Sequence, residues 1–276
     1  MKKYDVTGIG NALVDIEFKV KDQFFTDNGV EKGLMTLVDE DRQNALMQVI
    51  NTEQAKKQCG GSAGNTVIAL AQRTMNTFLG ITETYSRADV DEVAIKDSQY
   101  LYIEGYLITS ENGKQAMIHA KKTAEENGVK VALTFSDPAM VKYFKDPMTE
   151  VIGASVDLLF ANEEEAMIFT GKDNLLEARE ELKKVAKHFV ITQGKNGAMI
   201  YDGDTFIDIE PYATAAIDSN GAGDMFAGAF MYGITNGHSY ASSGKLASMA
   251  SSKIVSQFGP RLQGHEAKEI LAKLNP

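Results

Sequence analysis

Short apolar runs alternate with helix-like stretches along most of this chain, and that alternation constrains the fold more than any other feature. Runs rich in Val, Ile, Leu and Phe lie at residues 5–10, 99–103, 129–135, 156–160 and 189–192. Stretches rich in Ala, Glu and Lys at helical spacing, such as 113–127 and 174–187, lie between them. Strands that alternate with helices imply an α/β fold, with a mostly parallel sheet covered on both faces.

Two segments depart from this rhythm. Residues 196–209 predict a hairpin, because Tyr201–Asp204 supplies turn chemistry between two short apolar runs. Near the N-terminus, 16–20 and 34–38 resemble two strands, separated by Asp27–Gly29, before the first helix begins near Asp39. We therefore expect a small β unit attached to the main domain.

Charge and composition exclude several classes of protein. The chain of 276 residues has 38 acidic and 28 basic residues and a net charge of −10, which argues against a nucleic-acid partner. One Cys and four scattered His exclude an intramolecular disulfide framework and the common zinc motifs. The most apolar stretch, 225–234, is far shorter than the roughly 20 residues of a membrane span, and no signal peptide follows Met1. We expect a soluble cytoplasmic protein with no membrane partner.

The strongest local motif is Asp218–Asp224, Asp-Ser-Asn-Gly-Ala-Gly-Asp. An apolar helical face starts directly after it, so Gly221–Gly223 lies at a helix N-terminus, where free amides and the helix dipole attract anions. A carboxylate at Asp224 would be repelled by a bound phosphate unless it had a task, such as accepting a proton from a hydroxyl nucleophile. Alternatively, Asn220 is an ordinary N-cap and Asp224 only favours the first turn.

A second glycine cluster, Cys59–Asn65, also leads into a helix-like run. By itself it is equally typical of a packing device at a helix start. The sequence Gly8–Asn11, with Asp15 four residues later, is not the dinucleotide fingerprint, because Leu13 stands where the third glycine is needed. No Gly-Lys pair is followed by Ser or Thr, so a Walker A loop is absent. Any phosphate chemistry must therefore use the helix start at 221–224.

Two further motifs follow predicted strands. Asn162–Glu165 places acids at the carboxyl end of a strand, where α/β proteins bind ligands and a carboxylate can hold magnesium directly or through water. A solvated helix N-terminus is the alternative. Thr192–Gly197 is a strand end with a glycine turn, which by itself also fits a plain hairpin entry.

Taken in this order, the four motifs resemble those of the ribokinase-like (PfkB) family of carbohydrate and nucleoside kinases. The likeness extends over about 4–261, and within the family it is greatest to the adenosine kinases, which have similar runs at 10–16, 60–62, 102–109 and 159–166. The resemblance implies a three-layer α/β/α domain over 1–15 and 39–276, with a mostly parallel central sheet and a small β lid over 16–38.

The same resemblance implies a role for each matching residue. Asp224 would be the catalytic base, with Arg73 near the transferred phosphate and the amides of Gly221, Ala222 and Gly223 as the anion hole. Asn11, Asp15, Gly60, Gly61, Ser62 and Asn65 would bind the ribose-like hydroxyls of the substrate. Asn162, Thr192, Gly194 and Gly197 would face ATP, and Glu165 and Asn162 would organise Mg²⁺, mostly through water. Some members also hold K⁺, here at Asp218, Asn220, Ser256 and Gly259.

Two departures from the family pattern stand out. Ser219 replaces the usual Thr, which keeps the hydroxyl. Several tens of lid residues are missing between the glycine helix and Arg73. No turn residue separates the helical pattern ending at Gln72 from the strand-like pattern after it, so we expect a segment to be missing at this join, with a Cα–Cα distance well beyond the 3.80 Å of a trans peptide.

These features predict an ATP- and magnesium-dependent phosphotransferase that acts on a primary hydroxyl of a nucleoside, with adenosine the first candidate. A ribose- or fructose-type sugar kinase and a lid-deficient nucleoside-binding protein are the alternatives. We expect a monomer or a homodimer. The aromatic pair Tyr102 and Tyr106 offers a surface that would pack on a purine, unless one or both are core residues.

Overall fold

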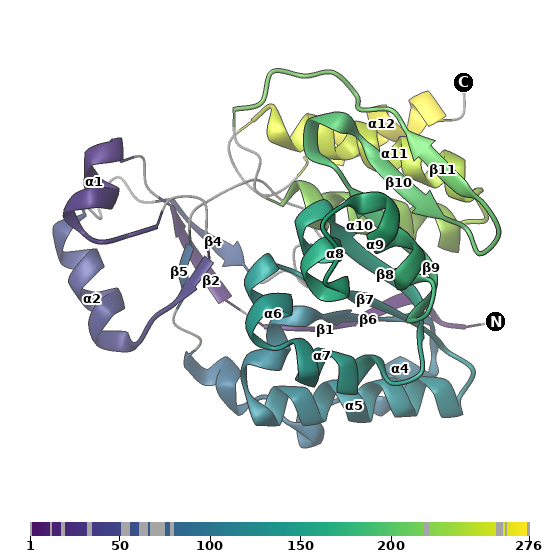
Figure 1. The fold of residues 1–276 in the computed structure, drawn as a ribbon, viewed down its shortest axis with the longest axis horizontal. Helices are drawn as coiled ribbons and strands as arrows, with labels where there is room; N and C mark the ends of the chain where they lie inside the picture. The colour runs from purple at the N-terminus through teal and green to yellow at the C-terminus, as the bar shows by residue number, and fades with distance from the viewer. Residues whose placement is uncertain are drawn as a thin grey trace.

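A computed structural model describes most of the chain, in the ranges 2–11, 13–17, 20–31, 35–50, 56–60, 66, 75–77, 80–217, 221–257, 262 and 264–274. Within these residues the main sheet has seven strands in the order β1-β6-β7-β8-β9-β10-β11 (Figure 1). The first five of these run parallel, and β10 and β11 are antiparallel additions at one edge. The strands are β1 (Tyr4–Ile9), β6 (Ser98–Glu104), β7 (Lys130–Thr134), β8 (Val156–Asn162), β9 (Ala186–Thr192), β10 (Ala198–Tyr201) and β11 (Phe206–Ile209).

Helices cover both faces of this sheet, which gives the three layers expected from the sequence. One face packs against α4 (Glu92–Lys96), α5 (Glu111–Glu126), α6 (Pro138–Tyr143), α7 (Lys145–Ile152), α8 (Glu163–Thr170) and α9 (Leu175–Leu182). The other face packs against α10 (Ala222–Thr235) and α11 (Tyr240–Val255), with α12 (Gly264–Leu274) outside them. Short 3₁₀ helices lie at η2 (Gly80–Thr84), η3 (Arg87–Asp89), η4 (Gly105–Thr109) and η5 (Gly194–Asn196).

The parallel strands bring their carboxyl ends to one edge of the sheet. Ile9 pairs in register with Ile103, Glu104 with Thr134, and Asn162 with Thr192. The residues that follow these ends are therefore neighbours in space although they are far apart in sequence. Ligands of open α/β sheets bind at this edge.

The strands expected at 5–10, 99–103, 129–135, 156–160 and 189–192 and the hairpin near 196–209 are confirmed, but the helix expected over 174–187 is shorter. The strand expected at 16–20 begins earlier, at Leu13, and ends at Glu17. The helix α9 ends at Leu182, and β9 begins at Ala186. Lys187 lies on the strand, where its Nζ bonds the Oδ1 of Asp157 on neighbouring β8 at 2.8 Å. Burial of the apolar run 189–191 in the sheet extends the strand backwards into a segment with helical composition.

Two small sheets lie apart from the main one. The strand β2 (Leu13–Glu17) pairs with β4 (Lys56–Gly60) in antiparallel fashion, and β3 (Met35–Leu37) pairs with β5 (Met75–Thr77) in parallel. Figure 1 shows them beside α1 (Asp22–Asp27) and α2 (Glu40–Val49), on one side of the main sheet.

The helix near Asp39 is confirmed as α2, with the Asp39 side chain accepting from the Arg42 amide at 2.8 Å. It is not the first helix, because α1 precedes it. The division into a kinase domain and a lid over 16–38 stays a prediction, and the join at Gln72–Arg73 lies outside the described residues. Among the described residues, each helix is too short or too polar to span a lipid bilayer.

Candidate active site

The N-terminus of α10 has the form of an anion site. Gly221, the N-cap, has φ +63°, a left-handed conformation that glycine adopts without strain, and no side chain caps the helix there. Ala222 and Gly223 begin the helix, and a side chain added at Gly223 would find open space. The half-buried Asp224 follows in the first turn. A helix start without a side-chain cap, open space and one carboxylate therefore occur together, as phosphoryl transfer to a hydroxyl requires.

A close backbone contact fixes α10 against the segment after the second glycine cluster. A Cβ at Gly228 would meet the carbonyl oxygen of Thr66 at 2.1 Å, so only glycine fits there. Thr66 is buried, and its Oγ1 donates a hydrogen bond to the hydroxyl of Tyr102 at 3.1 Å. Burial, reinforced by the charge of Asp224, raises the pKa of that Tyr102 hydroxyl. The helix that carries Asp224 and the segment after 59–65 thus meet at one side of the sheet edge.

The predicted acceptor side begins at the end of β1. Asn11 is buried, and its backbone amide donates to the Oε2 of Glu104 at 2.8 Å. Glu104 is itself a buried carboxylate at the end of β6. Asp15 lies on β2 opposite Gln58, and Gly60 is the last residue of β4. The structure thus adds Glu104 to this side, and the signal was an acid at the carboxyl end of a buried strand.

Several residues implied by the family resemblance lie outside the described part of the chain. These are Gly61, Ser62, Asn65 and Arg73 on the acceptor and phosphate side, and Asp218, Asn220 and Gly259 of the cation set. Their roles stay predictions.

The Asn162–Glu165 motif is a buried capping box at the start of α8. The carboxylate of Glu165 accepts from the Asn162 backbone amide at 2.9 Å and from its Nδ2 at 2.8 Å, and Asn162 Oδ1 accepts from the Glu165 amide. Glu165 is only 4% exposed, so the alternative of a solvated helix start is wrong for this residue. Burial first, and then the nearby carboxylates of Asp137, Glu164 and Asp224, raise the pKa of Glu165 to about 8, while the hydrogen bond from the Asn162 amide opposes the shift.

Negative charge gathers at this edge of the sheet. Burial is the main cause that raises the pKa of Tyr106, and the carboxylates of Asp137, Asp224, Glu104 and Glu165 all add to it. Burial also raises the pKa of Asp137. Among the described residues, no three His, Cys, Asp or Glu side chains form a ready metal cage. Mg²⁺ often takes only one or two carboxylates and completes its shell with water and phosphate, so these oxygen donors fit it.

The nucleotide-side motif lies where β9 ends. Thr192 is its last residue and pairs in register with Asn162. The turn that follows contains Gly194 with φ +55° and Gly197 with φ +92°. A Cβ at Gly197 would meet the carbonyl oxygen of Ile209 at 2.0 Å, so the turn packs tightly against the end of the hairpin. The positive φ values and the close contact with Ile209 therefore explain why this turn contains glycines, which a plain hairpin entry would not require.

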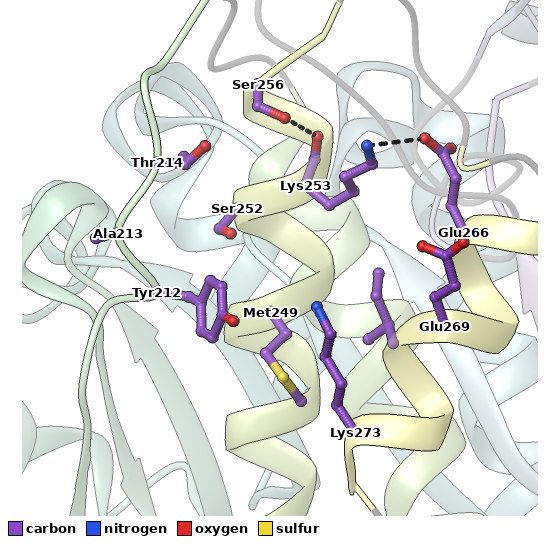
Figure 2. A pocket seen from close by; sticks show the side chains of 11 residues that line it. Tyr212, Ala213, Thr214, Met249, Ser252, Lys253, Ser256, Glu266, Glu269 and Lys273 are labelled. Atoms are coloured by element: carbon purple, nitrogen blue, oxygen red, sulfur yellow. Dashed lines mark hydrogen bonds and ion pairs between the residues drawn. The ribbon is translucent and has the colours of Figure 1, made fainter.

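Ser256, the described member of the predicted cation set, lies at a cavity between α11, α12 and the segment 212–214 (Figure 2). The cavity has a volume of about 220 Å³. Lys253 Nζ and Glu266 Oε1 form an ion pair of 3.0 Å at its wall, and the Ser256 hydroxyl donates to the Lys253 carbonyl at 2.7 Å (Figure 2).

The prediction that Tyr102 and Tyr106 form an aromatic surface for a purine is wrong for Tyr102. Tyr102 is 1% exposed and packs against Phe160, with ring centroids 6.2 Å apart, so it belongs to the core. Tyr106 is half-buried at the edge of the sheet. On one continuous strand, residues 102 and 106 would point to the same face of the sheet. Here the strand ends at Glu104 and η4 begins at Gly105, so the two side chains lie in different surroundings.

Comparison with known proteins supports the fold and identifies the family. The sequence pattern described as "pfkB family carbohydrate kinase" matches residues 42–267, so the chain belongs to this family. It is 27% identical over 215 residues to adenosine kinase of Dictyostelium discoideum, covering 71% of this chain but 62% of that protein. The chain thus spans less than two thirds of that curated relative.

Two solved structures match nearly the whole chain. A "probable sugar kinase" from Rhizobium etli is 28% identical, with a TM-score of 0.92 over 99% of this chain and 100% of that one. An adenosine kinase from Sinorhizobium meliloti is 27% identical, with a TM-score of 0.91 over 98% and 99%.

Proposed function

We propose that this protein is an ATP- and Mg²⁺-dependent kinase that phosphorylates a primary hydroxyl of a nucleoside, with adenosine the first candidate. The observation that carries the proposal is the N-terminus of α10, where a helix start without a side-chain cap, open space at Gly223 and the Asp224 carboxylate occur together. Membership of the pfkB family and the likeness to adenosine kinases support it.

Each side chain then has a task that its position allows. Asp224 accepts the proton of the acceptor hydroxyl, while the amides of 221–223 stabilise the charge on the transferred phosphoryl group. Asn162 and Glu165 would hold Mg²⁺ and its waters, and the ion would neutralise charge on the phosphates. Thr192 and the turn after it face the nucleotide. Asn11 and Asp15 hold the acceptor, so catalysis is mostly a matter of position and charge.

A panel of acceptors tests the proposal directly. ADP release is measured with ATP, Mg²⁺ and each of adenosine, guanosine, cytidine, ribose and fructose. We expect kcat/KM to be higher for a purine nucleoside than for either sugar. A higher kcat/KM for fructose or ribose would favour the sugar kinase, a candidate supported by the likeness to the R. etli protein. Tight nucleoside binding without ADP release would instead indicate a binding protein.

Replacing Glu165 by Gln should raise the Mg²⁺ concentration needed for half-maximal rate. A neutral amide holds Mg²⁺ and its waters more weakly than a carboxylate. Because the pKa of Glu165 is raised to about 8, protons compete with the cation in the wild type. Its Mg²⁺ requirement should therefore fall as pH rises from 7 to 9, and that of the variant should change less.

The exposed Asp173 supplies the control, since Asp173→Asn removes one negative charge in the turn after α8 without touching the Asn162–Glu165 capping box. Its Mg²⁺ titration should follow the wild type at each pH. Equal Mg²⁺ titrations for Glu165→Gln and the wild type would show that Glu165 does not take part in binding the metal.

A further inference from the structure

Ser136 has an unusual backbone conformation at the sheet edge. It is the residue other than glycine with positive φ, +72°, in the described part of the chain. This left-handed conformation costs free energy for a residue with a side chain, and it persists only where surrounding contacts impose it. Ser136 lies two residues after the end of β7 and directly before Asp137, the N-cap of α6.

Hydrogen bonds show what the conformation achieves. The Oγ of Ser136 accepts from the backbone amide of Gly105 at 2.9 Å, and its own amide donates to the Oγ1 of Thr134 at 3.1 Å. A Cβ at Gly105 would meet the carbonyl oxygens of Thr134 and Phe135 at 2.5 and 2.8 Å. The ends of β6 and β7 are therefore joined backbone to backbone, with the Ser136 side chain closing the contact.

The contact continues to the predicted acceptor side. Gly105 directly follows Glu104, and the buried Glu104 carboxylate accepts from the amide of the buried Asn11 at 2.8 Å. Two hydrogen bonds, one between Gly105 and Ser136 and one between Asn11 and Glu104, thus connect Ser136 with Asn11 across the neighbouring strands β7, β6 and β1. Because the Glu104 side chain is 1% exposed, packing leaves its torsions little freedom, and a displacement of Gly105 is passed to the carboxylate that accepts from Asn11.

We propose that Ser136 is a positioning residue for the acceptor side of the site, acting through Gly105 and Glu104 on Asn11. The inference rests on the proposed function, because it takes Asn11 to contact the acceptor. In the proposed arrangement, Ser136 itself touches neither substrate nor nucleotide. It sets the distance between the acceptor and the base, so its loss should weaken acceptor binding rather than nucleotide binding.

Two variants separate the hydrogen bond from the backbone strain. Ser136→Gly removes the hydroxyl but accepts φ +72° freely, whereas Ser136→Ala removes the hydroxyl and keeps the strain. We expect both to raise the KM for the acceptor about tenfold, the usual scale for one lost hydrogen bond, and to change the KM for ATP less than about twofold. The Gly variant should unfold at a higher temperature than the Ala variant.

Ser239→Ala is the matched control. It removes a similar bond, from the Ser242 amide to the Ser239 Oγ at 3.2 Å, at the far end of α10 from Asp224. Its KM values should equal those of the wild type. An unchanged acceptor KM in Ser136→Gly, or equal rises in the KM for ATP and acceptor, would overturn the proposal.

Amide hydrogen exchange gives a readout that does not need activity. In Ser136→Gly, the amides of both Gly105 and Asn11 should exchange faster than in the wild type, while the amide of Met225 in α10 should not change. Faster exchange at Gly105 alone would refute the coupling to Asn11. If the wild type phosphorylates no acceptor, the proposed function fails, and this exchange experiment still decides whether Ser136 positions Asn11.

Discussion

Asp224→Asn should lower kcat by roughly 10²–10⁴ and leave the binding of ATP and acceptor nearly unchanged, because general bases contribute about this much to rate. The amide keeps the size and the polar contacts of the side chain but cannot take the proton of the acceptor hydroxyl. The measurement is steady-state ADP release together with calorimetric binding of both ligands. Asp224 lies in the first turn of α10, where a negative charge also interacts favourably with the helix dipole, so Asp224→Asn should in addition cost a few tenths of a kcal/mol to about 1 kcal/mol of stability.

Asp173→Asn is a suitable control for the loss of one acidic group. Asp173 is exposed in the turn after α8, and its replacement should leave kcat unaltered. More than about half of the wild-type kcat in Asp224→Asn would show that another group accepts the proton. Weak binding of both ligands by that variant would instead indicate a structural role.

Gly197→Ala should have the largest effect on stability. The new Cβ would lie 2.0 Å from the Ile209 carbonyl oxygen, and the residue would keep a φ of +92°. Overpacking typically costs 1–3 kcal/mol, and the ψ of −135° places Gly197 in a region that residues with a side chain rarely adopt, which adds about 1–3 kcal/mol, so we expect a loss of at least about 3 kcal/mol. Urea unfolding measures it. The KM for ATP should rise at least about tenfold, because the turn carries the predicted nucleotide side.

The control is Gly171→Ala, at the left-handed C-cap of α8. Gly171 has φ +68°, but a Cβ there would meet nothing within 4 Å. It should lose only about 1 kcal/mol, the cost of the conformation alone, and keep the wild-type KM for ATP. Equal losses in the two variants would mean that the contact with Ile209 relaxes without cost.

Patterns local in sequence predicted most of the fold. The apolar runs at 99–103, 129–135, 156–160 and 189–192 became β6, β7, β8 and β9, because a strand buried on both faces needs such a run. The turn residues 201–204 predicted the β10–β11 hairpin, and the glycines at 221–223 predicted the start of α10. In each case the residues that carry the sequence pattern are the same residues that form the strand, the turn or the helix start.

Features that depend on contacts between distant segments were missed. The conformation of Ser136 is held by Gly105, 31 residues away, and nothing near Ser136 in the sequence demands it. Glu104 bonds Asn11 across 93 residues. The helix α1 was missed because its six residues, including two Phe, have no clear helical period. The helix α6 was missed as well, although it begins at Pro138 with Asp137 as its N-cap, and an Asp-Pro pair is typical of a helix start.

The contact between Gly228 and the Thr66 carbonyl sets a limit on how the site of this protein can be altered. Two backbones that touch without an intervening side chain keep α10 and the segment at Thr66 at a fixed separation. Under the proposed function, the main chain therefore sets the distance from the base to the acceptor. Replacement of side chains around the acceptor can then change which molecule is chosen while that distance is preserved. Substitutions can therefore change which substrate is bound without changing the geometry of proton transfer.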